Sequence, residues 1–146
     1  MPNRWISDGF HSLRESGMTA LPLITARIAP FGGLAGGAAS ASQDVTLLVD
    51  TGAAITCIAD EVIFNLSLDW VRQEQVSLVS GPDRLNMYMA EVGIFPTDDS
   101  GMRHHRVEIG TFLGQSHIYQ GLLGRDLLAH YDFRLTACRD YSLVPV

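Results

Sequence analysis

Apolar residues occur along this chain in short alternating or continuous runs, and this pattern predicts strands rather than long helices. Turn-forming residues interrupt the runs at intervals of roughly ten residues, which is typical of an all-β barrel or sandwich. Two short helical segments are expected, at residues 60–64 with Asp60 as the N-cap and at residues 127–130 with Asp126 as the cap. The predicted strands are residues 21–28, 45–49, 55–58, 75–79, 85–92, 106–113, 115–119, 132–136 and 141–144.

The segments between these runs suggest how the chain is organised. Residues 31–42 are rich in glycine, alanine and serine, and they predict a long surface loop. Residues 80–84 contain Gly81 and Pro82 and predict the turn of a β-hairpin over residues 75–92. Residues 1–20 lack a clear pattern, so we expect a flexible N-terminal arm followed by a single domain over residues 21–146.

Composition narrows the class of protein. A chain of 146 residues fits one domain with its own core, and 47% apolar with 18% charged residues excludes a disordered polymer. The net charge of −6 gives no basis for binding nucleic acid. No apolar run approaches the ~20 residues of a membrane-spanning helix, and Met1–Trp5 does not read as a secretory signal. We therefore expect a cytoplasmic protein, although a processed fragment would look the same.

The most informative stretch is Val45–Ala53, an apolar strand that ends in Asp50, Thr51 and Gly52. An ionised carboxylate at the end of a buried strand is costly unless it is paired or used. Gly52 lets the backbone turn where a Cβ would cause strain. The arrangement suits acid–base chemistry, and the alternative is a turn aspartate that binds its own backbone.

A second segment, Gly121–Leu128, places two leucines between glycines before a short helix. In this order, the two segments resemble the retropepsin-like (retroviral-type) aspartic proteases, as a single-domain bacterial or cellular member. The resemblance spans roughly Pro22–Val144. It implies an all-β, retropepsin-like acid-protease barrel with one short C-terminal helix, equivalent to one half of a pepsin-like fold.

The resemblance also implies roles for individual residues. Such proteases use two carboxylates about 3 Å apart that share one proton. A chain with one such loop can supply the pair only across the two-fold axis of a homodimer. The implied roles are catalysis for Asp50, support of the active loop for Thr51, Gly52 and Ala53, structural support behind the loop for Leu122, Leu123 and Gly124, and a substrate-covering flap for Val79, Ser80, Gly81 and Pro82.

The sequence therefore predicts a homodimeric aspartic endopeptidase that hydrolyses extended peptides or proteins without a cofactor. The alternative is a non-catalytic dimerisation or peptide-binding domain of the same fold. An intact Asp-Thr-Gly run favours the enzyme, whereas a flap with a single glycine favours the alternative. In many viral members an arginine at the position of Arg125 pairs with an acid that Ala54 replaces here. Arg125 must therefore bind either a carboxylate of the other subunit or a backbone carbonyl.

The remaining titratable residues indicate no further chemistry. His104, His105 and His117 are expected to be exposed to solvent, because no cysteine or carboxylate recurs at a metal-ligand spacing. Cys57 and Cys138 are expected to be free thiols. The alternative, in an oxidising compartment, is a disulfide between them.

Overall fold

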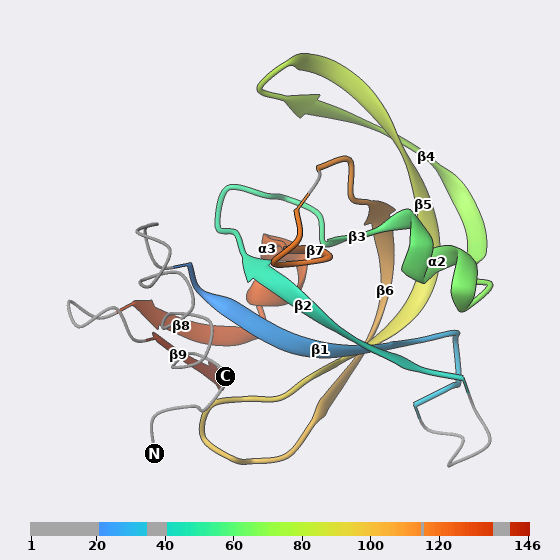
Figure 1. Ribbon diagram of the computed structural model, residues 1–146. Helices are drawn as coiled ribbons and strands as arrows, with labels where there is room; N and C mark the ends of the chain where they lie inside the picture. The colour runs from blue at the N-terminus through green and yellow to red at the C-terminus, as the bar shows by residue number, and fades with distance from the viewer. Residues whose placement is uncertain (1–20, 35–40, 115, 136–140) are drawn as a thin grey trace.

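The computed structural model describes residues 21–34, 41–114, 116–135 and 141–146 of the chain (Figure 1). The predicted N-terminal arm, residues 1–20, lies outside the described residues. The elements in chain order are β1 (Leu23–Ala29), β2 (Gln43–Val49), β3 (Cys57–Ile58), α2 (Asp60–Asn65), β4 (Asp69–Leu78), β5 (Gly81–Ile94), β6 (Arg103–Thr111), β7 (Gly121–Leu123), α3 (Arg125–Leu128), β8 (Tyr131–Leu135) and β9 (Tyr141–Pro145).

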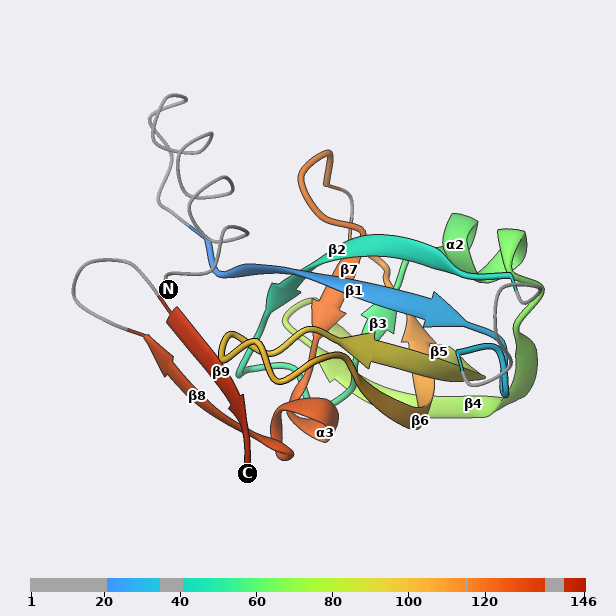
Figure 2. The same cartoon turned by 90° about the horizontal axis from the view of Figure 1, so that it is seen from below.

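Seven of these strands form one sheet that closes on itself. The strand order is β1-β2-β7-β3-β6-β5-β4, and β1 also pairs with β5, so six strands form a barrel and β4 lies outside it. The β2–β7 and β3–β6 pairs are parallel, and the others are antiparallel. The β4–β5 hairpin therefore extends beyond the barrel and curves over it (Figures 1 and 2).

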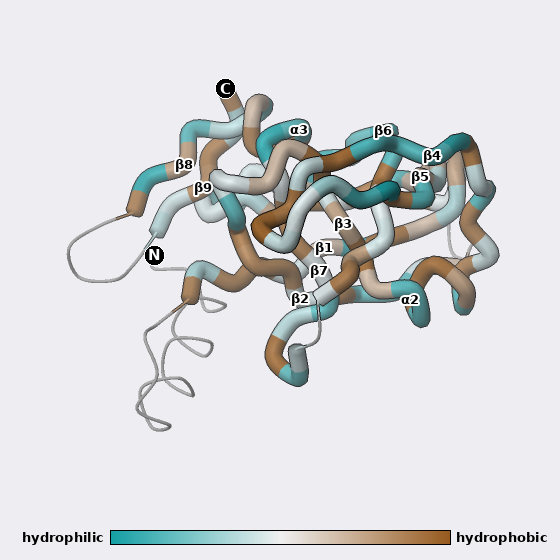
Figure 3. The backbone as a smooth tube through the Cα atoms, turned by 90° about the horizontal axis from the view of Figure 1, so that it is seen from above, coloured by the Kyte–Doolittle hydropathy of each residue, from teal (hydrophilic) through white to brown (hydrophobic). Residues whose placement is uncertain are grey.

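The barrel interior holds the main hydrophobic core. Buried and less buried residues alternate along β2, as expected for a strand with one face toward the core. Figure 3 shows the hydropathy of each residue along the barrel strands. Burial of apolar surface contributes about 25 cal/mol per Å² to folding. The large side chains with almost no exposed surface include Ile24, Ile28, Leu47, Ile58, Ile94, Ile109 and Leu123.

The C-terminal strands β8 and β9 form a separate two-stranded sheet. Polar contacts join this sheet to the barrel. The Tyr141 hydroxyl donates to the Leu23 carbonyl at 2.6 Å, and Thr97 Oγ1 donates to the Leu143 carbonyl while accepting from the Leu143 N–H. The closing hairpin expected over residues 132–144 is therefore present, and its turn lies outside the described residues.

A predicted strand and a predicted helix cap differ from the structure. The described residues of the predicted strand 115–119 form no strand and bend at His117 and Ile118. Ser116 Oγ accepts the N–H groups of Ile118 and Tyr119, so these groups are not available to a neighbouring strand. Asp60 is the first residue of α2, not its cap; the N-cap is Ala59, with no side-chain cap bond. A carboxylate in the first turn still favours the helix through its dipole.

Candidate active site

Asp50 directly follows β2 and lines a cleft. Its backbone N–H donates to the Leu123 carbonyl at 3.0 Å, which fixes the end of β2 against β7. Its Oδ1 accepts the Gly52 N–H at 2.8 Å, an Asx-type turn. Oδ2 makes no hydrogen bond with any described residue. One oxygen of the carboxylate is thus held by the loop and the other is available to a ligand.

Gly52 lies close to this carboxylate. The predicted strain of a Cβ at this position does not come from the backbone conformation, because the described glycines with left-handed φ are Gly32, Gly81 and Gly101. A Cβ at position 52 would instead lie 3.1 Å from Asp50 Oδ1. The small size of the residue, rather than its freedom of rotation, matches the geometry of the turn.

Arg125 lies beneath the loop and binds it at several points. Its Nη1 donates to the carbonyl oxygens of Thr51 at 2.9 Å and Gly52 at 3.2 Å, and its backbone N–H donates to the Ala53 carbonyl at 2.8 Å. The sequence left two kinds of partner open for Arg125, a carboxylate of the other subunit or a backbone carbonyl. Among the described residues, Arg125 binds backbone carbonyls.

The Gly121–Gly124 segment packs directly behind the loop. β7 inserts between β2 and β3, where Leu122 pairs with Leu48 on one side and Cys57 on the other. Leu123 has no exposed surface, and Leu122 faces the cleft. A Cβ on Gly124 would lie 2.6 Å from the Ile55 carbonyl carbon, so a side chain there would push this segment away from the loop.

Sequence reasoning missed the contact between Thr56 and Asp126. Thr56 is fully buried, and both its N–H and its Oγ1 donate to the Asp126 carboxylate, at 3.0 and 2.7 Å. The predicted cap role of Asp126 is wrong, because the N-cap of α3 is Gly124 and no side chain caps the helix. No spacing rule links two residues this far apart in the chain.

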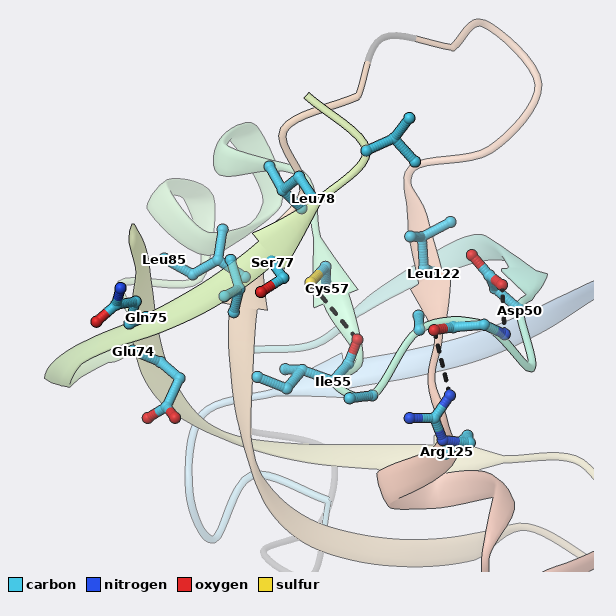
Figure 4. Close-up of a pocket in the computed structure, with 15 residues that line it drawn as sticks. Asp50, Ile55, Cys57, Glu74, Gln75, Ser77, Leu78, Leu85, Leu122 and Arg125 are labelled. Carbon is cyan, nitrogen blue, oxygen red and sulfur yellow. Dashed lines mark hydrogen bonds between the residues drawn. The ribbon is translucent and has the colours of Figure 1, made fainter. Parts of the chain in front are cut away.

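A cleft of about 690 Å³ separates the active loop from the β4–β5 hairpin (Figure 4). Such a volume is in the usual range for a ligand site. Its wall is mainly apolar, with Asp50 and Glu74 at opposite ends (Figure 4). The lining residues are Asp50, Gly52, Ala53, Ala54, Ile55, Cys57, Glu74, Gln75, Val76, Ser77, Leu78, Val79, Leu85, Leu122 and Arg125.

The tip of the hairpin holds the residues predicted as a flap. Val79 and Ser80 connect β4 to β5, and Val79 is fully exposed. Gly81 has a φ of +118°, a conformation that other residues rarely adopt, while Pro82 follows it on the surface. A second hollow of about 610 Å³ adjoins the cleft between this tip and Phe112.

Cys57 contributes a thiol to the cleft wall. Burial, and then the charge of Asp126, raises the pKa of Cys57 to about 11, and its Sγ donates to the Ile55 carbonyl. The thiol is free and protonated at neutral pH. Cys138 lies outside the described residues.

The histidines differ in their surroundings. His104 and His117 are exposed as expected, but the expectation is wrong for His105, which is half-buried and hydrogen-bonded to the Tyr131 hydroxyl. Burial, followed by His130 and His104, lowers the pKa of His105. Across the described ranges, no group of three or more potential ligands could hold a metal ion. No helix in the same ranges is long and apolar enough to cross a membrane.

Comparisons with known proteins point to one family. The family model described as retroviral aspartyl protease matches residues 20–136, which include the Asp50 loop and the Gly121–Gly124 segment. Among solved structures, the chain is similar to a retropepsin-like aspartic protease from Rickettsia conorii, with 17% identity and a TM-score of 0.49. That match covers 87% of this chain and 97% of the other. No curated protein matches the chain.

Proposed function

The chain belongs to the retroviral aspartyl protease family, and we propose that it is a homodimeric endopeptidase with one Asp50 from each subunit as its catalytic pair. Membership of this family, together with the closed sheet, confirms the predicted retropepsin-like, all-β barrel. The observation that carries the proposal is the state of the Asp50 carboxylate. One oxygen is fixed by the Gly52 N–H, and the other faces the cleft without a partner among the described residues.

The reaction needs a second carboxylate close to the first. In the singly protonated pair, one carboxylate takes a proton from water while the other donates to the carbonyl oxygen of the scissile bond. Glu74 is the other carboxylate in the cleft wall, but it forms an ion pair with Arg72 at the opposite end. A two-fold axis beside Asp50 would supply the missing group from a second copy of the chain.

The rest of the site supports an extended peptide as substrate. The apolar cleft wall suits side chains, and exposed backbone groups at the hairpin can pair with a peptide main chain. We propose that Val79, Ser80, Gly81 and Pro82 cover the bound peptide. Thr51 would brace the two loops against each other, and residues 21–146 would form the single catalytic domain.

Substitution of the proposed catalytic residue tests this function. We expect Asp50→Asn to abolish cleavage of unfolded casein while the circular dichroism spectrum and the dimer content stay unchanged. Asp98→Asn is a matched control, because Asp98 Oδ1 accepts the Ser100 N–H in the same type of turn, away from the cleft. Cleavage by purified Asp50→Asn would refute the assignment. A wild-type dimer that binds peptides without cleaving them would favour a non-catalytic domain.

A further inference from the structure

The contact between Thr56 and Asp126 ties the active loop to the start of α3. We propose that these two residues are a positioning pair for Asp50, which holds the catalytic carboxylate in place without touching the substrate. The proposal rests on the proposed function of Asp50.

Hydrogen bonds converge on this contact from both segments. Thr56 Oγ1 donates to Asp126 Oδ1 at 2.7 Å and accepts the Gly124 N–H at 3.0 Å. Thr56 N–H donates to Asp126 Oδ2 at 3.0 Å, and Leu127 N–H donates to Oδ1 at 2.8 Å. The threonine hydroxyl is thus used as both donor and acceptor, and three donors meet one carboxylate.

The pair closes one end of the loop that begins at Asp50. At the other end, the Asp50 N–H donates to the Leu123 carbonyl. Leu123 and Asp126 belong to one continuous segment, so both ends of the loop are fixed to the same short piece of chain. A catalytic group displaced by about 1 Å can cost on the order of 100-fold in rate. Loss of either tether therefore acts on the position of Asp50.

The chemistry of the two residues fits this role better than mere space filling. Valine at position 56 would keep the shape but leave the Gly124 N–H and Asp126 Oδ1 without that partner. Serine would keep the hydroxyl. Asparagine at position 126 would turn an NH₂ group toward one of the three donors. Hydrogen bonds to a charged acceptor are also stronger than neutral ones.

Stability must be separated from positioning in the test, and the chain offers a matched control. Thr97 Oγ1 donates to the Leu143 carbonyl at 3.2 Å and accepts the Leu143 N–H at 2.9 Å. This donor-and-acceptor pattern matches that of Thr56, but it joins the loop after β5 to β9, and Thr97 is not a cleft residue. Thr56→Val and Thr97→Val thus each remove one donated and one accepted hydrogen bond, although Thr56 donates to a carboxylate and Thr97 to a carbonyl.

The experiment measures kcat, KM and the denaturation midpoint for wild type, Thr56→Val, Thr56→Ser and Thr97→Val, normalised to folded dimer. We expect both valine variants to lower the midpoint. Only Thr56→Val should lower kcat, by about 10- to 100-fold, with KM within about twofold of wild type. Thr56→Ser should restore most of kcat. If Thr56→Val does not fold, Asp126→Asn takes its place in the same comparison.

Hydrogen exchange of residues 51–55 gives a second readout that does not need activity. Exchange should be faster in Thr56→Val than in wild type or Thr97→Val. Unchanged loop exchange, a kcat equal to that of Thr97→Val, or a change in KM alone would overturn the positioning pair. If Asp50→Asn is inactive and Thr56→Val is fully active, the positioning role of Thr56 and Asp126 is refuted, while the proposed function of Asp50 stands. Wild type that cleaves nothing refutes the proposed function, and the exchange measurement still decides on the pair.

Discussion

Arg125 Nη1 donates to the Thr51 carbonyl oxygen at 2.9 Å, so the guanidinium supports the active loop through the backbone rather than through a carboxylate. Hydrogen bonds from a charged donor contribute about 1.5 kcal/mol or more, and roughly 1.4 kcal/mol is a factor of ten in rate. We therefore expect Arg125→Met to lower kcat by about tenfold. The steady-state kinetics of the folded dimer measure the effect.

Arg125→Lys is the informative companion variant. Lysine keeps the charge but lacks the planar fork of donors. We therefore expect an intermediate kcat if hydrogen-bond geometry matters. Equal activity of the methionine variant and wild type would mean that the backbone bond from Arg125 N to the Ala53 carbonyl is sufficient to hold the loop.

The sequence predicted much of the barrel because each strand has its own local pattern. Val45–Val49 and Leu85–Val92 combine apolar periodicity with clear turn residues, and both lie within strands of the structure. The strand predicted at residues 115–119 was wrong, because the Ser116 side chain accepts two backbone N–H groups in a contact that composition does not reveal. β3 also begins later than the expected residue 55, since Thr56 is bound to Asp126 before the strand begins at Cys57.

Glu91 is a buried carboxylate that holds the loop after β1. Its oxygens accept the N–H groups of Gly32 at 2.8 Å and Leu34 at 2.9 Å, and Arg106 lies 3.5 Å away. Burial alone would raise the pKa of Glu91, but the Leu34 and Gly32 bonds, followed by Arg106 and His104, outweigh it and lower the pKa. The charged form is therefore stabilised in the folded state.

This depressed pKa predicts a pH-dependent stability. The contribution of the charge is fully present above the ordinary pKa of 4.5 and is lost as the pH falls through the lower folded-state pKa. We expect Glu91→Gln to reduce the free energy of unfolding at pH 7 by about 1.5–3 kcal/mol, and the difference from wild type to shrink below pH 4.5. Urea denaturation from pH 7 to pH 3 measures both values.

The control for Glu91 is Asp44→Asn. Asp44 forms an exposed ion pair with Arg27, and such pairs contribute little to stability. A loss at pH 7 equal to that of Glu91→Gln, or a Glu91→Gln difference that does not change with pH, would contradict the assigned role of the buried charge.

The thiol of Cys57 should react slowly. Its pKa of about 11, against an ordinary 9.0, lowers the thiolate fraction by about 100-fold at pH 8. Alkylation by iodoacetamide, followed by mass spectrometry of the Cys57 peptide, should show this slow rate in the folded protein and an ordinary rate in urea. Asp126→Asn should speed the folded reaction, because it removes the second cause of the shift. Equal rates with and without urea would contradict the expected protection.

The residues that complete the site could not be predicted from spacing. Thr56 and Asp126 meet only because β7 inserts between β2 and β3, a topology that no local pattern encodes. Glu91 interrupts an apolar run, Ala90–Ile94, and this interruption was the available signal for a paired buried charge. Arg125 was recognised as a group in need of a partner, but its choice of backbone depends on the path of the loop.

Assembly should control activity if the catalytic pair spans two subunits. We expect specific activity to fall on dilution, and inactive Asp50→Asn chains to suppress wild type by forming mixed dimers. Random exchange predicts that activity per wild-type chain falls to about one quarter at a threefold excess of inactive chains. Asp98→Asn chains should instead leave activity intact. Full activity of a wild-type monomer in sedimentation would contradict the shared site.

The β4–β5 hairpin should be the most mobile part of the cleft. β4 pairs only with β5, whereas each barrel strand pairs with at least two others. The inner face of the hairpin rests on a small apolar cluster around Leu85 and Met87, and the tip leaves Leu78 and Val79 exposed. Segments with few buried contacts open at low free energy, and cover elements are drawn from such segments.

Hydrogen exchange tests this expectation with an internal control. Backbone amides of residues 75–86 should exchange faster than those of Val92–Ile94, which lie in the same β5 strand but inside the closed barrel. A non-cleavable peptide analogue should slow exchange in residues 75–86 and leave Val92–Ile94 unchanged, because the peptide would bury the apolar tip and occupy its free backbone groups. The same slow exchange along the whole hairpin, with or without the analogue, would mean a static wall. In that case substrates would have to enter from the ends of the cleft rather than beneath a moving cover.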